Sequence, residues 1–180
     1  MRVILLKNQQ QDILVDQNIL ILHSLRTIIS DLDDQTYTAT REPYYSSSLG
    51  AHTRHILDHY LMLLAGVDSG EVNYDNRNRD PEVETNRDHA KATVGRIIDG
   101  LKQLPGMDTP VKAIINVSVD SSPLPQDSTL GRELVFLHGH TTHHHSLMAL
   151  IMRLQDKTVG SDFGFAPATL KYRSEQACAR

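Results

Sequence analysis

The segment HGHTTHHHSLMAL, residues 138–150, places five histidines within eight consecutive positions. Imidazole changes its charge near neutral pH and is the commonest side-chain ligand for transition metals. The cluster runs directly into an apolar stretch, so we interpret it as part of a helix and not as an appended tag. Metal binding and proton transfer are therefore the chemistry to consider.

Helical geometry assigns a direction to each of these imidazoles. On a helix over residues 130–155, an arc of roughly a quarter turn collects Leu137, His140, His144, Leu147 and Ile151. His140 and His144 lie in the middle of this apolar face, one turn apart. His143 lies at its edge, while His138 and His145 are predicted to point toward solvent.

Two inward imidazoles at positions i and i+4 can bind one ion from the same side. The alternative is that His140 and His144 are both core residues, each hydrogen-bonded to some polar group. Burial of two such rings side by side without a shared partner costs several kcal/mol. The pair therefore favours a metal.

An earlier segment, AHTRHILDH, offers three further histidines along one border of an apolar helix face: His52, His55 and His59. Helical bundles build metal sites from side chains on facing helices. By phase alone His52 and His59 lie nearer the centre of the face than His55, so periodicity leaves the choice open. Asp58 is predicted to point away from this border, at the surface.

Four segments carry the helical period that positions these residues. They cover residues 8–33, the SSSLG segment to Gly66, Asp80 to Leu104, and 130–155. Residues 111–119 alternate like a strand, which we interpret as an extended crossover or a single short ribbon. The tail, with Phe163, Phe165 and Tyr172, is expected to wrap back over the helices. The prediction is one all-α domain over residues 1–180, a four-helix bundle with a long crossover between its third and fourth helices.

Composition excludes several classes of partner. A net charge of -4, 5% aromatic residues and no Trp argue against a nucleic-acid surface. No stretch approaches the roughly 20 apolar residues of a membrane span. The one cysteine, Cys178, excludes an internal disulfide. We expect a soluble, cytoplasmic protein.

Two charged residues are predicted to lie on apolar helix faces. Glu133 lies two turns before His140, and Arg87 falls among the apolar positions of the third helix. A buried charge needs a partner, so an Arg87–Glu133 ion pair is one interpretation. In the other, Glu133 orients a ligand imidazole or acts as a catalytic base.

The loop NYDNRNRD contains Tyr74, Arg77 and Arg79. These side chains could hold an anionic substrate at the mouth of the site. Equally, the loop is rich in residues that form Asx turns and could be a solvated connection. Both interpretations stay open.

The pattern LGAHTRHILDHY followed by HTTHH resembles the DinB/YfiT-like family of metal-dependent proteins. NYDNRNRDPEVE, GRELVF and DFGFAPATLKYR are similar to one subgroup of that family. The resemblance implies a four-helix bundle in which His55, His140 and His144 hold a divalent metal. The related domain of ergothioneine-forming sulfoxide synthases has a similar His-x-x-His spacing, with the second histidine as ligand. The surplus of His52, His59 and His143 leaves room for another ligand set.

Three neutral histidine ligands leave an ion with open positions for water or substrate, unlike a closed structural zinc site. Imidazole suits several metals, and we expect zinc or nickel, with iron as the alternative. The resemblance implies a metal-dependent enzyme, a hydrolase or a thiol-dependent transferase or isomerase, acting on a small molecule such as a low-molecular-weight thiol. The alternative is a metal-binding stress or interaction protein without turnover. The resemblance also implies a homodimer.

Overall fold

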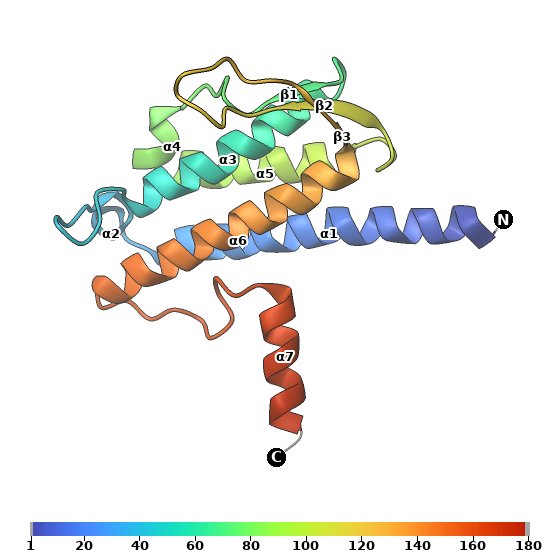
Figure 1. The fold of residues 1–180 in the computed structure, drawn as a ribbon. Helices are drawn as coiled ribbons and strands as arrows, with labels where there is room; N and C mark the ends of the chain where they lie inside the picture. Colours follow the sequence, from blue (N-terminus) through green and yellow to red (C-terminus); the bar gives the residue numbers. More distant parts are fainter. Residues whose placement is uncertain (1, 179–180) are drawn as a thin grey trace.

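Helices form most of the structure, a computed structural model that describes residues 2–178 (Figure 1). The helices are α1 (Arg2–Asp31), α2 (Asp34–Thr38), α3 (Leu49–Gly66), α4 (Pro81–Thr85), α5 (Arg87–Leu101), α6 (Leu130–Leu154) and α7 (Pro167–Cys178). The strands are β1 (Glu71–Asn73), β2 (Pro110–Ile114) and β3 (Gln126–Thr129). The expectation of an all-α fold is therefore wrong in one respect, because three strands form a small sheet.

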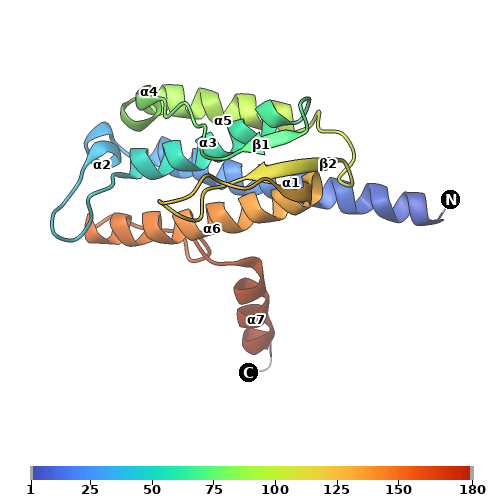
Figure 2. The ribbon, with the colours of Figure 1, turned by 45° about the horizontal axis from the view of Figure 1, so that its top comes forward.

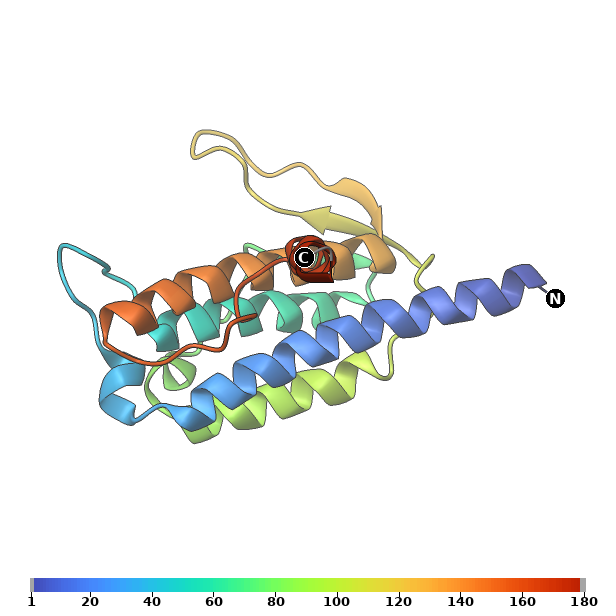
Figure 3. The ribbon, with the colours of Figure 1, turned by 90° about the horizontal axis from the view of Figure 1, so that it is seen from below.

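The four long helices enclose the core. Helix α1 packs against α5 and α6, and α3 packs against the same two helices (Figure 3). Each contributes an apolar stripe with spacings of three and four residues, which include Leu22, Leu25 and Ile29 of α1, Ile56, Tyr60 and Leu63 of α3, Val94, Ile97 and Leu101 of α5, and Leu130, Leu134 and Leu137 of α6. Among the described residues, no helix combines the length and the hydropathy needed to cross a bilayer.

Side-chain caps explain where the helices begin. As predicted, α3 opens within the SSSLG segment, and it starts directly after Ser48, whose hydroxyl accepts from the Ala51 N–H at 3.0 Å. The helix predicted from Asp80 to Leu104 is divided in two, because Asn86 adopts an extended conformation between α4 and α5. Its side chain accepts from the N–H groups of Asp88 and His89, so local capping overrides the helical period.

The sheet joins segments that are far apart in sequence. Strand β1 pairs with β2 in parallel, with Val72 opposite Ala113, and β2 pairs with β3 in antiparallel orientation. The predicted extended segment 111–119 is thus neither a lone ribbon nor a strand along its whole length, since β2 ends at Ile114. Alternation of apolar residues indicates a strand, but it does not identify the strand's partners.

Two residues predicted to face solvent are buried. Asp58 is 3% exposed and pairs with Arg54 at 3.4 Å, and charged residues of the loop before α4 lie near it. His145 is 2% exposed and stacks on Phe163 with ring centroids 4.4 Å apart. In both cases a segment outside the four long helices lies against a face that helical periodicity assigns to the surface.

The C-terminal tail follows the helices only in part. Gly164, with φ +82, lies so close to α6 that a Cβ atom would come within 2.8 Å of the Cα of Ser146. After this contact α7 projects away from the other helices (Figures 1 and 2). Tyr172 on α7 is 62% exposed, so the expectation that it returns to the helices is wrong.

A buried polar network links three of the long helices. The Tyr60 hydroxyl on α3 donates to Asn18 Oδ1 on α1 at 2.7 Å. Thr141 of α6 donates to the Tyr60 oxygen at 3.3 Å, and the Asn18 amide donates to the Leu134 carbonyl at 3.2 Å. The network fixes the rotation of α3 relative to α6, because its members are fully enclosed.

We predict that Tyr60→Phe lowers the free energy of unfolding by about 1–3 kcal/mol, because it leaves the Asn18 oxygen without its donor in a dry environment. Urea unfolding followed by circular dichroism measures this change. Tyr172→Phe, at an exposed tyrosine, is the matched control and is expected to have no effect. Equal stability of the Tyr60→Phe protein and the unsubstituted protein would contradict the assigned network.

Candidate metal centre

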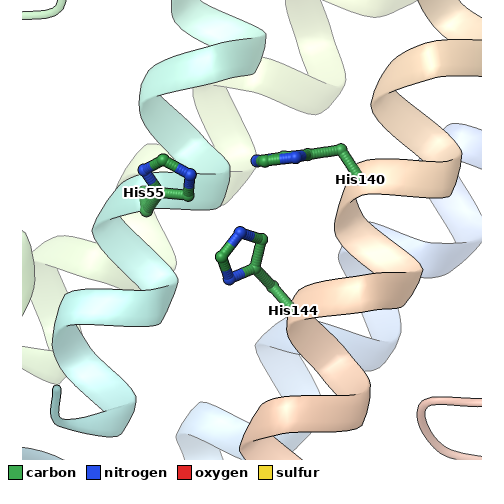
Figure 4. Close-up of side chains that lie close together, drawn as sticks. All are labelled: His55, His140 and His144. Atoms are coloured by element: carbon green, nitrogen blue, oxygen red, sulfur yellow. The ribbon is translucent and has the colours of Figure 1, made fainter. Parts of the chain in front are cut away.

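Three histidines from two helices converge in the space between α3 and α6. His55 comes from α3, and His140 and His144 come from α6 (Figure 4). One possible ligand atom from each ring lies within 4.8 Å of the other two. The ring of His55 lies 5.0 Å from that of His140 and 4.6 Å from that of His144, centroid to centroid. The rings turn toward one another, so a single ion could contact all three.

The local structure explains why these rings meet. His140 and His144 are four residues apart on α6, so they project from the same face on successive turns. Helix α3 packs against both α5 and α6, so the centre of its apolar face points between these two helices. The histidines at the border of that face therefore lie toward α6. His52 approaches His144, His59 approaches His140, and His55 lies between them and approaches both.

The protonation states of the three rings suit a metal. Burial, followed by the neighbouring histidines His59 and His143, lowers the pKa of His140 to about 4. Burial is also the main cause that lowers the pKa of His55 to about 3, and it lowers the pKa of His144. All three rings are then neutral at pH 7, as coordination requires.

The burial of one ring nitrogen, Nε2 of His140, is also consistent with a metal ligand. His140 Nε2 is inaccessible to solvent and has no hydrogen-bond partner among the described residues. A buried polar atom without a partner costs about 1–3 kcal/mol. A divalent metal at this point would give the atom a partner, so the donor set and the burial are consistent with a metal centre.

The further histidines His52, His59 and His143 lie beside the three rings. His52 Nδ1 lies 3.0 Å from His144 Nδ1, and His59 Nδ1 donates to the His55 carbonyl oxygen at 2.8 Å. His143 is exposed, with its ring 5.2 Å from that of His144. Among the described residues, the three ligand atoms that lie within 4.8 Å of one another come from His55, His140 and His144 and not from these further histidines.

The two charged residues predicted on apolar faces are not partners. Arg87 pairs with Asp34 at 2.6 Å, so the predicted Arg87–Glu133 ion pair is wrong. Buried Glu133 instead accepts hydrogen bonds from Tyr74 at 2.7 Å and from Ser128 at 2.5 Å. Sequence periodicity missed these partners because they belong to β1, β3 and their flanks, which reach α6 only through the sheet.

The residues of the NYDNRNRD loop differ in their relation to the centre. Tyr74 is buried, and its ring stacks on His59 with centroids 5.5 Å apart. Arg77 reaches the cluster directly and places Nη1 2.9 Å from His55 Nδ1. Arg79 is exposed and has a positive φ of 51°. Of the three, Arg77 is therefore the cation in contact with a candidate ligand.

Comparison with known proteins gives one family match. The sequence model of the DinB superfamily matches residues 21–148, a range that includes the three histidines. FK506-binding protein 5 of Rhizopus delemar is 31% identical over 110 residues, which are 58% of this chain. The chain spans only 28% of that relative's length. No solved structure matches.

His145 gives a contrast to the three histidines. It lies next to His144 on α6 but faces Phe163, and its Nε2 atom is buried without a hydrogen-bond partner among the described residues. Burial lowers its pKa to about 3. The unfolded chain binds a proton at this residue below about pH 6.5, whereas the folded chain does not until about pH 3.

We therefore predict that His145 makes stability depend on pH. Its contribution is constant above pH 6.5 and is lost as the pH falls from 6.5 toward 3, because folding excludes a proton that the unfolded state binds. Between pH 7.5 and pH 5, the loss is about 2 kcal/mol. Urea unfolding at both pH values with a chelator present measures it, and His145→Phe should reduce the difference by that amount. An unchanged difference would refute the assignment.

Proposed function

The chain belongs to the DinB superfamily, and from that premise we propose that it is an enzyme that binds one divalent metal through His55, His140 and His144. The observation that carries the proposal is the convergence of the three rings from two helices to within 4.8 Å. The buried, unpartnered Nε2 of His140 supports it independently. We also interpret the four long helices as the four-helix bundle that the family resemblance implies.

The expected chemistry is that of an open site. Three protein ligands leave positions for other groups, whereas structural zinc sites use four protein ligands. A divalent metal in such a site acidifies a bound water or thiol or polarises a carbonyl group. A hydrolase, or a transferase or isomerase that uses a low-molecular-weight thiol, would need this chemistry. Zinc or nickel is our first choice and iron the alternative, because imidazole binds all three.

A small cavity beside the cluster is suited to part of a small substrate. It has a volume of about 210 Å³ and is lined by Tyr74, Ala113, Ile115, Gln126, Asp127, Ser128, Arg132, Glu133 and Phe136. The ring of Phe136 stacks on His140 with centroids 5.7 Å apart, so the cavity and the centre share an aromatic wall. In this proposal Tyr74 and Arg132 contact the substrate, while Arg77 and Arg79 attract its negative charge.

A metal-binding stress or interaction protein without turnover is the second candidate. The observation that favours it is the position of His59, whose ring lies 4.2 Å from that of His140 and could approach as a fourth ligand. Azide added to the cobalt-loaded protein distinguishes the two. A change in the visible spectrum indicates an open position and favours the enzyme, whereas no change indicates a closed site.

The resemblance also leads us to propose a homodimer. Light scattering at working concentrations measures the mass in solution, and a monomer mass would refute this proposal.

We predict that alanine at His55, His140 or His144 abolishes stoichiometric metal binding, because each substitution removes a third of the ligand set. Metal analysis of dialysed protein measures the loss. His143→Ala removes an exposed histidine from the same helix and should retain the metal. Full retention in His55→Ala, together with loss in His52→Ala or His59→Ala, would overturn the assignment.

We predict that chelation at pH 7.5 lowers Tm by about 5–10 °C but leaves a cooperative helical transition. Free metal at 100 times its Kd adds about 2.7 kcal/mol, whereas the apolar stripes of the four long helices do not need the ion to pack. Thermal unfolding with and without chelator measures the shift, and His140→Ala should show none. Complete unfolding on chelation would indicate a structural site.

A further inference from the structure

Arg77 determines which nitrogen of His55 carries the proton. The guanidinium has N–H donors only and stays charged, so its contact at 2.9 Å makes His55 Nδ1 the acceptor. A neutral imidazole has one N–H and one free lone pair. While Arg77 is in place, the proton of His55 is therefore on Nε2 and its lone pair is occupied at Nδ1.

This state is incompatible with coordination by a neutral His55, whichever nitrogen is the ligand. If Nδ1 binds the ion, the ion takes the lone pair that Arg77 uses. If Nε2 binds the ion, the proton moves to Nδ1, where its N–H opposes the N–H of Arg77. In either case the hydrogen bond between Arg77 and His55 must break first.

The other two candidate ligands have no such conflict. His144 Nδ1 lies 3.0 Å from His52 Nδ1, so His144 can coordinate through Nε2 while its Nδ1–H donates a hydrogen bond to a neutral His52. This is the usual arrangement of a metal-ligating histidine, which donates its second N–H to a neighbour. His140 Nε2 has no hydrogen-bond partner among the described residues, so coordination there would break no hydrogen bond. Of the three candidate ligands, His55 is therefore the one whose hydrogen-bond partner, Arg77, opposes coordination of a metal.

The position of Arg77 permits its release. Its Nε atom is buried without a hydrogen-bond partner among the described residues, so the present contact leaves one donor unsatisfied. Its chain neighbours Asn76 and Asn78 are exposed in the connection between β1 and α4, so movement of the side chain does not require the core to repack. In its present place, the cation also repels an incoming divalent ion.

We propose that Arg77 is a built-in antagonist of metal binding, which holds His55 in the non-ligating tautomer until its guanidinium is withdrawn. The inference rests on the proposed function, since it takes His55 as a ligand, and it adds the regulation of that site. The ion and the Arg77 contact exclude each other, so whatever draws Arg77 away strengthens metal binding.

Cobalt titration in a chloride buffer at neutral pH, followed by visible absorption against a competing chelator, tests this competition. We expect Arg77→Met to bind cobalt at least about tenfold more tightly than the unsubstituted protein, because a hydrogen bond from a charged donor no longer opposes it. Arg77→Gln should bind at least as tightly as Arg77→Met, since its amide oxygen can accept from Nδ1–H. Arg79→Met removes an equal charge from the same loop and should leave the affinity unchanged.

The outcomes separate this inference from the proposed function. Equal cobalt affinity in the Arg77→Met and unsubstituted proteins would overturn the inference alone, as would an equal gain in Arg79→Met, which indicates a general charge effect. Cobalt binding by none of the proteins would overturn the proposed metal site itself. Nitrogen-15 NMR of the histidine rings needs no metal. It should show His55 protonated at Nε2 in the unsubstituted protein, and protonation at Nδ1 would refute the role of Arg77.

Discussion

The contact between α3 and α6 is the constraint on which the rest of the structure depends. Residues 55 and 140 are far apart in the chain, and their side chains meet only because these two helices pack with one rotation. The fully enclosed network of Asn18, Tyr60 and Thr141 selects that rotation, since a turn of either helix would leave buried polar atoms without partners. The same rotation brings the border of α3 toward α6, and with it His55.

This packing would be unfavourable if the histidines were charged. The rings of His55, His140 and His144 lie about 5 Å apart, so protonation would place like charges together in a partly dry space. Burial, followed by the neighbouring histidines, lowers their pKa values and keeps the rings neutral. A neutral imidazole still has a lone pair that needs a donor or an ion. At His55, either Arg77 or a divalent metal can bind this lone pair, but the two cannot bind it at the same time.

The strands, loops and short segments outside the four long helices provide the contacts of several buried polar groups on α3 and α6. Strand β3 and the residue that follows β1 place Ser128 and Tyr74 against Glu133, so both donate hydrogen bonds to this buried carboxylate. The loop after β1 brings Arg77 to His55. The loop before α4 places charged residues near Asp58, and Phe163 stacks on His145. Each of these contacts joins parts of the chain that have no common helical period.

The sequence by itself determined the helical stripes and the direction of His140 and His144, because these follow from the turn per residue within one helix. The resemblance to a family pointed to His55, which periodicity alone ranked behind His52 and His59. Only the tertiary structure decided that His55 faces α6, that β2 lies between β1 and β3, and that Asp58 and His145 are buried. It also decided that Arg77 contacts His55, whereas Arg87 pairs with Asp34. The physical reason is that a residue's environment depends on which distant element packs over it. The spacing of apolar residues within one helix or strand contains no information about that element.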